Sequence, residues 1–270
     1  MPASTQHMPF RMTTYIPVAK KHWGQHFLQD RSLCQEIVQL LGDTSSYGSV
    51  IEVGPGRGAL THWLREDVDA PLYLVEVDKA MVDYLTQTYP MLQSRLIHQD
   101  FVDFSFDQLP QGDVALIGNL PYNMGSQILL HAVSHRTRVT TIVCMLQKEV
   151  AQRIASPPSS KRYGLLSVWL QAFYTISYQL EVPPSAFIPP PKVTSAVLRM
   201  DRYRTSLPCD AAYLFRVVKT AFQQRRKILG NALAPLGMPL NNISYDLLKR
   251  RAEQLSVEEF ITLTQRLTLT

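Results

Sequence analysis

The feature that most constrains the fold is a short, mainly apolar run that stops at a cluster of glycines. Residues 49–53 read Ser-Val-Ile-Glu-Val, and Gly54, Gly56 and Gly58 follow within five positions. Glycine lets the backbone turn tightly and lets a ligand approach main-chain atoms. Because a helical pattern over residues 59–65 follows, the sequence predicts a strand, a glycine turn and a helix in that order.

Similar apolar runs alternate with helical patterns from about residue 48 to residue 200. We expect further strands over residues 72–77, 96–99, 114–118 and 140–146, and helices over residues 79–88 and 126–135. Most of these runs are mainly apolar rather than alternating, which is typical of parallel strands covered on both faces. The pattern therefore predicts an α/β fold with a mainly parallel sheet and helices on both faces.

The pattern changes after residue 200. Helices are predicted over residues 210–234, 245–251 and 257–267, with Ser256 as N-cap and Glu259 completing a capping box. We therefore expect two domains, 1–200 and a small all-helical domain at 201–270, with residues 1–19 flexible. Proline is excluded from helix interiors and central strands, so the proline-rich stretch 182–191 is expected to be a surface loop.

Charge is distributed unevenly along the chain. The formal net charge is +5, and all of it falls on residues 201–270, which hold 11 Lys and Arg against 6 Asp and Glu. A neutral body with a basic end favours a polyanionic partner that binds at this end. A solvated helical surface is the alternative, and charge alone favours neither.

Composition excludes several classes of protein. Hydrophobic residues make up 46% of the chain, which argues against disorder, and no apolar run approaches the length of a membrane span. The three cysteines are scattered and lack metal-ligand spacing, which indicates a reducing compartment and no structural metal. We therefore expect a cytoplasmic protein that binds neither metal nor membrane.

Two acidic residues stand at the predicted ends of neighbouring strands. Glu76 ends the second strand, and Asp100 follows the third. Acids at these ends commonly hold the ribose hydroxyls of a nucleoside, and a carboxylate can accept an adenine amino hydrogen. The glycine turn, Glu76 and Asp100 together predict a nucleoside site, although each acid alone is equally consistent with a solvated loop. The glycine spacing fits a nicotinamide cofactor poorly.

The sequence Asn119-Leu120-Pro121-Tyr122 follows the next predicted strand. Proline pushes the preceding residue towards an extended conformation, so the peptide carbonyls near Leu120 are expected to face outward at the sheet edge. The side chains of Asn119 and Tyr122 then lie nearby. Carbonyl acceptors beside an aromatic ring suit an amino group on a planar base. The acceptors hold the amino hydrogens, and the aromatic face stacks on the base.

This turn, together with the glycine turn, Glu76 and Asp100, resembles the ribosomal RNA adenine dimethyltransferases, which use S-adenosylmethionine (SAM). Residues 21–28, 187–193 and 222–233 are similar to further segments of that family. The resemblance implies a Rossmann-like methyltransferase sheet. It is strongest to the housekeeping members, which dimethylate two adjacent adenosines near the 3′ end of small-subunit (16S) ribosomal RNA during subunit biogenesis. A pre-30S particle as partner and a monomeric enzyme are the corresponding expectations.

The resemblance also implies roles for individual residues. SAM contacts are expected from His26, Leu28, Gly54, Gly56, Glu76, Asp100 and Asn119. The Asn119 side-chain oxygen and the Leu120 carbonyl would orient the target amine, Tyr122 would stack on the base, and Phe187 would cover its other face. Arg225, Arg226 and Lys227 would contact RNA phosphates. His26 departs from the family pattern, which more often has Asn at this position.

Several alternative interpretations are consistent with the sequence. Phe187 could be a core aromatic, and the three basic residues could be a solvated face. A methyltransferase for DNA adenine or protein glutamine is disfavoured by Leu120, because those enzymes usually have Pro at that position. A large-subunit RNA methyltransferase of the resistance type and a non-catalytic ribosome assembly factor are the remaining alternatives.

Overall fold

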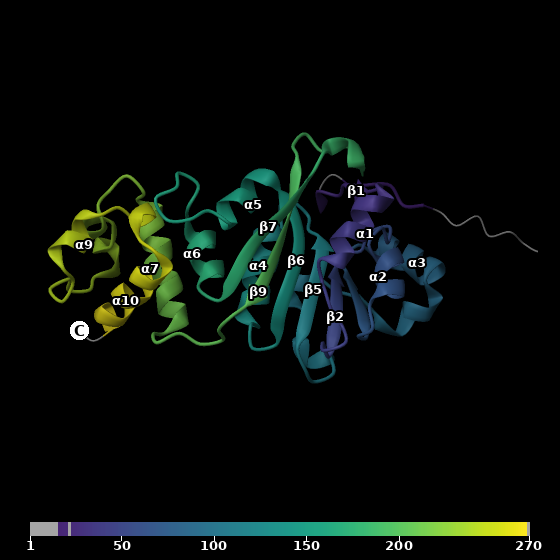
Figure 1. The fold of residues 1–270 in the computed structure, drawn as a ribbon, viewed down its shortest axis with the longest axis horizontal. Coiled ribbons are helices and arrows are strands. Elements are labelled where there is room, and N and C mark those ends of the chain that lie inside the picture. The colour runs from purple at the N-terminus through teal and green to yellow at the C-terminus, as the bar shows by residue number, and fades with distance from the viewer. Residues whose placement is uncertain (1–15, 21–22, 269–270) are drawn as a thin grey trace, which may run out of the picture.

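The computed structural model describes residues 16–20 and 23–268. Residues 1–15, for which flexibility is expected, and Lys21 and His22 of the 21–28 motif lie outside the described residues. The molecule is elongated, with the C-terminal helices at one end and α1 to α3 towards the other (Figure 1). An α/β body and a helical C-terminal part follow one another along this length, in the order that the sequence patterns predict.

A seven-stranded sheet forms the centre of the body. Its strand order is β4 (Leu96–His98), β3 (Leu72–Glu76), β2 (Ser49–Val53), β5 (Val114–Asn119), β6 (Val139–Gln147), β9 (Ser195–Arg202) and β7 (Tyr174–Val182). The strands from β4 to β6 are parallel, and β9 runs antiparallel to both β6 and β7. The five predicted strands are the parallel ones, so this part of the prediction is confirmed.

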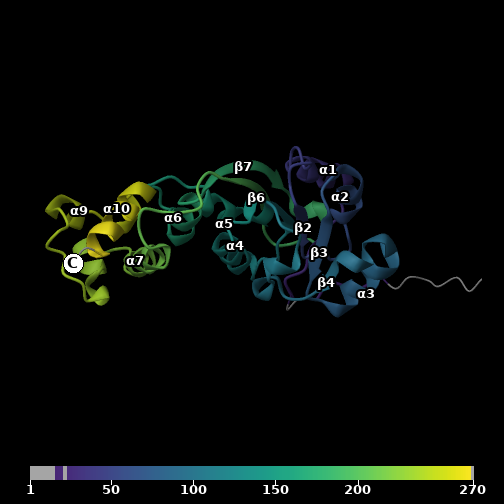
Figure 2. The same ribbon diagram turned by 90° about the horizontal axis from the view of Figure 1, so that it is seen from below.

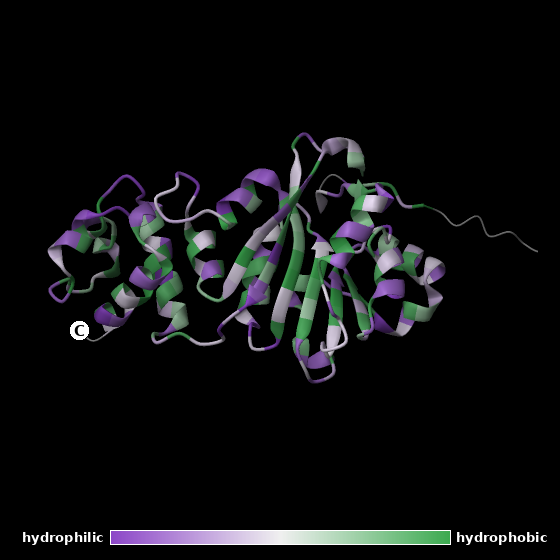
Figure 3. Ribbon diagram, in the orientation of Figure 1, coloured by the Kyte–Doolittle hydropathy of each residue, from purple (hydrophilic) through white to green (hydrophobic). Residues whose placement is uncertain are grey.

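Helices cover both faces of the sheet, as predicted (Figure 2). One face packs against α1 (Arg31–Gln39), α2 (Thr61–Asp67) and α3 (Lys79–Thr88). The other packs against α4 (Gly125–Ser134), α5 (Lys148–Ile154) and α6 (Leu165–Gln171). Hydropathy along the ribbon follows this arrangement, because the central strands are largely hydrophobic and the helices are mixed (Figure 3). Short 3-10 helices occupy several connections: η2 (Pro90–Arg95), η3 (Phe101–Asp103), η4 (Phe106–Gln108), η5 (Pro184–Ala186), η6 (Ala234–Leu236) and η7 (Ala252–Gln254).

The C-terminal part contains α7 (Ala211–Gln223), α8 (Leu229–Ala232), α9 (Tyr245–Lys249) and α10 (Val257–Thr268). The capping box before α10 is confirmed, because the Ser256 N–H donates to Glu259 (2.8 Å) and the Glu259 N–H donates to Ser256 Oγ (3.2 Å). The inner sides of α7 and α10 share one apolar core with α6 and a face of the sheet.

The single helix predicted over residues 210–234 is wrong. The chain leaves α7 at Gln224 and turns before α8 begins. The reason is a tertiary contact, since the Leu229 N–H donates to the Arg250 carbonyl (2.8 Å) and Ile228 forms a β-bridge with Arg251. These bonds replace the helical bonds that a continuous helix would make.

Several elements were not predicted from the sequence. They are the antiparallel strands β7 and β9 and the helices α1, α5 and α6. The proline-rich stretch is not simply a surface loop, because it contains β8 (Phe187–Ile188), which pairs antiparallel with β1 (Phe27–Leu28). Strand β9 continues to Arg202, two residues past the proposed boundary at residue 200. The two-domain division remains a proposal.

Candidate active site

A cavity opens at the carboxyl ends of the parallel strands. It measures about 1010 Å³ including its open mouth, and the turns after β2, β3, β4 and β5 line it together with residues 23–28. Nine of the predicted site residues line this cavity: His26, Leu28, Gly54, Gly56, Glu76, Asp100, Asn119, Leu120 and Tyr122. Because parallel strands present their carboxyl ends at one edge, motifs far apart in the sequence converge here.

The glycine turn forms the floor of the cavity and leaves room for a ligand. Gly54 has a φ of +67°, and a Cβ at this position would meet no protein atom within 4 Å. Gly56 has a φ of +53°, and its N–H donates to Glu76 Oε2 (3.0 Å). A side chain at Gly54 would be strained and would fill the open space, so glycine here keeps the cradle accessible.

Glu76 lies at the end of β3 and is only 4% exposed. Besides the Gly56 N–H, the N–H groups of Val77 (3.0 Å) and Asp78 (2.9 Å) donate to its Oε1 atom. Burial raises the pKa of this carboxyl, and the three backbone donors partly oppose the effect. The carboxylate is therefore held rigidly at the cavity wall, where it can accept further hydrogen bonds from hydroxyl groups.

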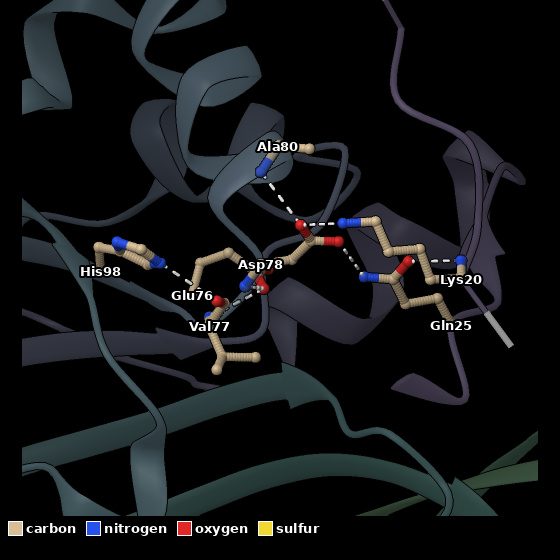
Figure 4. A network of polar contacts seen from close by, with 7 residues as sticks. All are labelled: Lys20, Gln25, Glu76, Val77, Asp78, Ala80 and His98. Carbon is tan, nitrogen blue, oxygen red and sulfur yellow. Dashed lines mark hydrogen bonds and ion pairs between the residues drawn. The ribbon is translucent and has the colours of Figure 1, made fainter. Parts of the chain in front are cut away.

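Asp78 connects this wall to the N-terminal segment. Lys20 Nζ donates to Asp78 Oδ1 (2.6 Å), and Gln25 Nε2 donates to Oδ2 (3.3 Å). Figure 4 shows Asp78 between the Lys20 and Gln25 side chains on one side and the start of α3 on the other, where the Ala80 N–H donates to Oδ1 (3.0 Å). The same view shows Glu76 beside it, with its carboxylate bonded to the backbone N–H groups of Val77 and Asp78.

Asn119 is the last residue of β5, and its side-chain orientation is fixed. Its Nδ2 donates to the His26 carbonyl (2.8 Å), so Oδ1 is the side-chain atom left to accept from a ligand. The next residue, Leu120, is anchored by its N–H, which donates to the Met145 carbonyl (3.1 Å). Among the described residues, no backbone N–H donates to the Leu120 carbonyl oxygen. Two acceptors that suit an amine are therefore present beside the cavity.

Tyr122 and His26 lie together at the same side of the cavity. Their ring centroids are 5.4 Å apart at an interplanar angle of 31°. Tyr122 Oη is hydrogen-bonded to Ser195 Oγ (2.6 Å), and His26 Nδ1 is hydrogen-bonded to the Pro189 carbonyl (2.8 Å). Burial raises the pKa of the Tyr122 hydroxyl. A carbonyl only accepts, so His26 Nδ1 is the donor of this hydrogen bond.

Four of the predicted site residues do not line the cavity. Phe187 is 2% exposed and packs with Leu28 and the core around α1, so in this structure it is a core aromatic rather than a cover for a bound base. Arg225, Arg226 and Lys227 lie in the exposed turn between α7 and α8, not in a helix. Arg225 Nη2 donates to the Lys161 carbonyl (2.6 Å), which brings the exposed cations Lys161 and Arg162 to the same turn.

Several residues of the site were not predicted from the sequence. Trp23, Gln25, Arg57 and Gln99 line the cavity, and Glu52 reaches it from within β2. The Thr61 hydroxyl donates to Glu52 (2.5 Å), and burial raises the Glu52 pKa to about 8. An acid inside an otherwise apolar strand was the available signal for Glu52. Nothing local marks Asp78 or Gln25, because their contact joins distant segments.

The sequence predicts neither a metal site nor a membrane-spanning helix. Among the described residues, no three His, Cys, Asp or Glu side chains are grouped as a metal site. The pair His131 and His135 packs against Phe106 instead, and His131 Nε2 is hydrogen-bonded to the Phe104 carbonyl (2.9 Å). No helix within the described ranges combines the length and the apolar character needed to cross a membrane.

Comparison with known families and sequences adds independent evidence. The family model described as "Ribosomal RNA adenine dimethylase" matches residues 17–269. The "Ribosomal RNA small subunit methyltransferase A" of Cytophaga hutchinsonii is 45% identical over 252 residues, which cover 92% of this chain and 97% of that protein. The protein of the same name from Flavobacterium johnsoniae is 45% identical over 254 residues, covering 92% and 95% of the two chains.

Solved structures share the fold. A dimethyladenosine transferase from Plasmodium falciparum superposes with a TM-score of 0.75 at 21% identity, over 90% of this chain and 98% of that chain. The 23S rRNA methyltransferase ErmE superposes with a TM-score of 0.67 at 21% identity, over 90% and 99% of the two chains. At this identity the likeness supports the architecture, and the predicted α/β methyltransferase fold with its helical C-terminal part is confirmed.

Proposed function

Because the chain belongs to the ribosomal RNA adenine dimethylase family and is a SAM-dependent methyltransferase, we propose that it dimethylates the N6 amines of two adjacent adenosines near the 3′ end of small-subunit ribosomal RNA. The relatives at 45% identity, which are named for the small subunit, favour this substrate over large-subunit RNA. The observation that carries the proposal is the cavity in which a nucleoside cradle adjoins the Asn119 and Leu120 acceptors.

The residues present fit the cofactor. The open cradle at Gly54 suits the aminoacyl part, and the rigid Glu76 carboxylate suits two ribose hydroxyls. Asp100 lines the same cavity next to Phe101, where its carboxylate would accept an adenine amino hydrogen. His26 and Leu28 complete the wall. When bound, SAM supplies an electrophilic methyl group on a sulfonium.

The contribution of the protein to the reaction is alignment of the amine. The lone pair of adenine N6 is delocalised into the ring, so the amine is a weak nucleophile unless it is held in line. Hydrogen bonds from N6 to Asn119 Oδ1 and to the Leu120 carbonyl would hold it at the cavity. Such alignment can lower a barrier by about 7–11 kcal/mol. For the second transfer one N–H remains, so one acceptor must tolerate the first methyl group.

The target base would rest on Tyr122. The bond between Tyr122 Oη and Ser195 Oγ fixes the ring, which reduces the entropy lost when a base stacks on it. Stacking of this kind contributes about 1–3 kcal/mol per base. An adenine must leave its own stack to reach this ring. Phe187 would have to leave the core to cover the other face, so we assign the stacking role to Tyr122 alone.

We assign the phosphate contacts to the exposed turn between α7 and α8, which is called the basic turn below. Arg225, Arg226 and Lys227, with Lys161 and Arg162 beside them, present exposed cations from two segments joined by the Arg225 hydrogen bond. Clustered Lys and Arg side chains bind RNA by neutralising phosphates. We also propose that the substrate is a pre-30S particle, that the enzyme is monomeric and that it is located in the cytoplasm.

Incubation with labelled SAM and undermethylated 30S subunits tests the proposal. We expect label at two adjacent adenosines near the 3′ end of the small-subunit RNA, and none on 50S subunits. Label on 50S subunits would indicate the resistance-type activity. Binding to 30S without label would indicate a non-catalytic assembly factor.

A further inference from the structure

The Asp78 carboxylate makes more contacts than a helix cap requires. Asp78 is the N-cap of α3 and needs one acceptor atom for the Ala80 N–H. It is nevertheless 2% exposed, and it also accepts from Lys20 Nζ (2.6 Å) and Gln25 Nε2 (3.3 Å). Lys20 and Gln25 precede it by more than fifty positions. The excess contacts therefore attach a distant segment to this corner of the sheet (Figure 4).

The attached segment forms a wall of the cofactor cavity. Residues 23–28 line the cavity, and Gln25, which bonds Asp78, is one of them. Within the segment, the Lys20 N–H donates to Gln25 Oε1 (2.9 Å), so one glutamine amide bonds both Lys20 and Asp78. At the far end, Asn119 Nδ2 holds the His26 carbonyl (2.8 Å). Residues 23–26 are thus held between Asp78 on one side and Asn119 on the other.

Asp78 also contacts a second part of the cavity lining. Its own N–H donates to Glu76 Oε1 (2.9 Å), the carboxylate that faces the cavity. Burial would raise the pKa of Asp78, but the hydrogen bonds from Lys20, Ala80 and Gln25 outweigh burial and hold the pKa below its usual value. Asp78 is therefore anionic at neutral pH, and the Lys20 ammonium balances its charge.

We propose that Asp78 is a positioning residue for cofactor binding, which holds Lys20 and Gln25 and thereby keeps residues 23–26 in place as a wall of the cavity. It touches no substrate itself. The inference rests on the proposed function, because it requires that SAM binds in this cavity. If only a fraction of the molecules has the wall in place, the apparent dissociation constant rises by the inverse of that fraction.

The test measures SAM affinity of the full-length protein by calorimetry. Asp78→Asn retains a good N-cap but removes the charge, and Lys20→Met removes the partner. We expect each to raise the Kd for SAM by about tenfold, as when the competent fraction falls to about a tenth. The double variant should show little further loss, because both changes break one contact. Lys20→Arg keeps the positive charge beside Asp78, so its Kd for SAM should lie within about twofold of the wild-type value.

Two further measurements separate positioning from general stability. In hydrogen exchange, the amides of residues 23–28 should exchange faster in Asp78→Asn, while those of the sheet stay protected. At saturating SAM, kcat and the KM for 30S subunits should match the wild type. The matched control is Asp83→Asn, which removes an exposed ion pair with Lys79 on the same helix and should leave the Kd unchanged.

Three results would contradict the inference, and each has a different meaning. A Kd within twofold of the wild type in Asp78→Asn, with a lower Tm, would show that Asp78 acts only as a helix cap and would overturn the inference. An equal rise in Kd in Asp83→Asn would do the same, because the effect would then not depend on the Lys20 contact. A wild-type protein that does not bind SAM would contradict the proposed function itself, and the inference with it.

Discussion

Residues from separate segments hold the polar groups of the cavity in place. The backbone of residue 26 fixes the Asn119 amide, and three backbone N–H groups fix the Glu76 carboxylate. Preorganised groups lose little freedom when a ligand binds, so more of the binding free energy remains for alignment. At the residue scale, ligand binding therefore depends on which atoms of each side chain already make hydrogen bonds within the protein and which remain to bind the ligand.

Replacing Asn119 with Ala should affect catalysis far more than cofactor affinity. The change removes the Oδ1 acceptor for the target amine and also the bond to the His26 carbonyl. Misalignment of a reacting group by about 1 Å can cost about 10²-fold in rate, so we expect a fall in kcat of this order. Single-turnover kinetics and SAM titration measure the two effects. A near-normal kcat would remove Asn119 from the mechanism.

Glu52 should make the stability of the fold depend on pH. Burial raises its pKa from 4.5 to about 8. A carboxyl with a higher pKa in the folded state binds its proton more tightly there. Its contribution to the free energy of unfolding is therefore fully present below about pH 4.5 and is lost as the pH rises through about 8. Glu52→Gln should reduce this loss, because an amide does not ionise.

Urea denaturation of both proteins at pH 5, 7 and 9 measures this effect. The wild type should lose more stability than Glu52→Gln between pH 5 and pH 9. The Thr61 hydroxyl donates to Glu52 and can donate equally to a glutamine oxygen, so the comparison isolates the charge. Parallel pH profiles of the two proteins would contradict the assignment.

At the scale of elements, the glycine turn joins β2 to α2 and also packs against a neighbouring helix end. Gly58 has a φ of +78°, and a Cβ there would lie 2.6 Å from the ring of Tyr89. The Tyr89 hydroxyl donates to the Gly58 carbonyl (3.1 Å), so this aromatic ring holds the turn in its shape. The turn is therefore set by packing as well as by the conformational freedom of glycine.

Comparing Gly58→Ala with Gly237→Ala separates these two causes. Gly237 has a φ of +66° with no atom within 4 Å of a Cβ, so its replacement adds backbone strain of about 1–2 kcal/mol only. Gly58→Ala adds the overlap with Tyr89, for which overpacking costs about 1–3 kcal/mol more. Denaturant titration should show the larger loss for Gly58→Ala, together with weaker SAM binding. Equal losses would show that Tyr89 moves aside freely.

At the scale of the whole molecule, the cavity and the basic turn occupy different parts of an elongated shape. The turn between α7 and α8 belongs to the C-terminal end, beyond α6, while α1 to α3 lie towards the other end (Figure 1). A bound RNA would then be held by phosphate contacts at one place and enter the cavity at another. Affinity for RNA and the rate of methylation should therefore respond to different substitutions.

Arg225→Glu combined with Arg226→Glu should weaken RNA binding and reduce its salt dependence. Each lost phosphate contact lowers the slope of log K against log salt by about one. SAM affinity should be unchanged, because neither residue lines the cavity. The control is Arg65→Glu with Arg95→Glu, an equal change of charge at exposed positions on α2 and η2. An unchanged salt slope would show that the basic turn does not meet phosphate.

Local sequence was enough to predict the parallel strands and seven residues of the cavity, whereas His26 and Leu28 were expected only from the family resemblance. An apolar run predicts a strand buried on both faces, and parallel strands bring their carboxyl ends to one edge whatever their separation in sequence. The glycine turn, Glu76, Asp100 and Asn119 each lie at the end of such a run or just after it, so their convergence follows from the architecture. The spacing of Ser256 and Glu259 was likewise enough to identify the capping box of α10.

Only the tertiary structure decided where distant segments meet. Pairing of β1 with β8 buries Phe187, and pairing near Arg250 breaks the long helix that periodicity predicts. The attachment of Lys20 and Gln25 to Asp78 likewise leaves no local pattern. Such contacts form because both partners gain burial or a hydrogen bond when the chain is folded. Neither partner signals that gain in its own stretch of sequence.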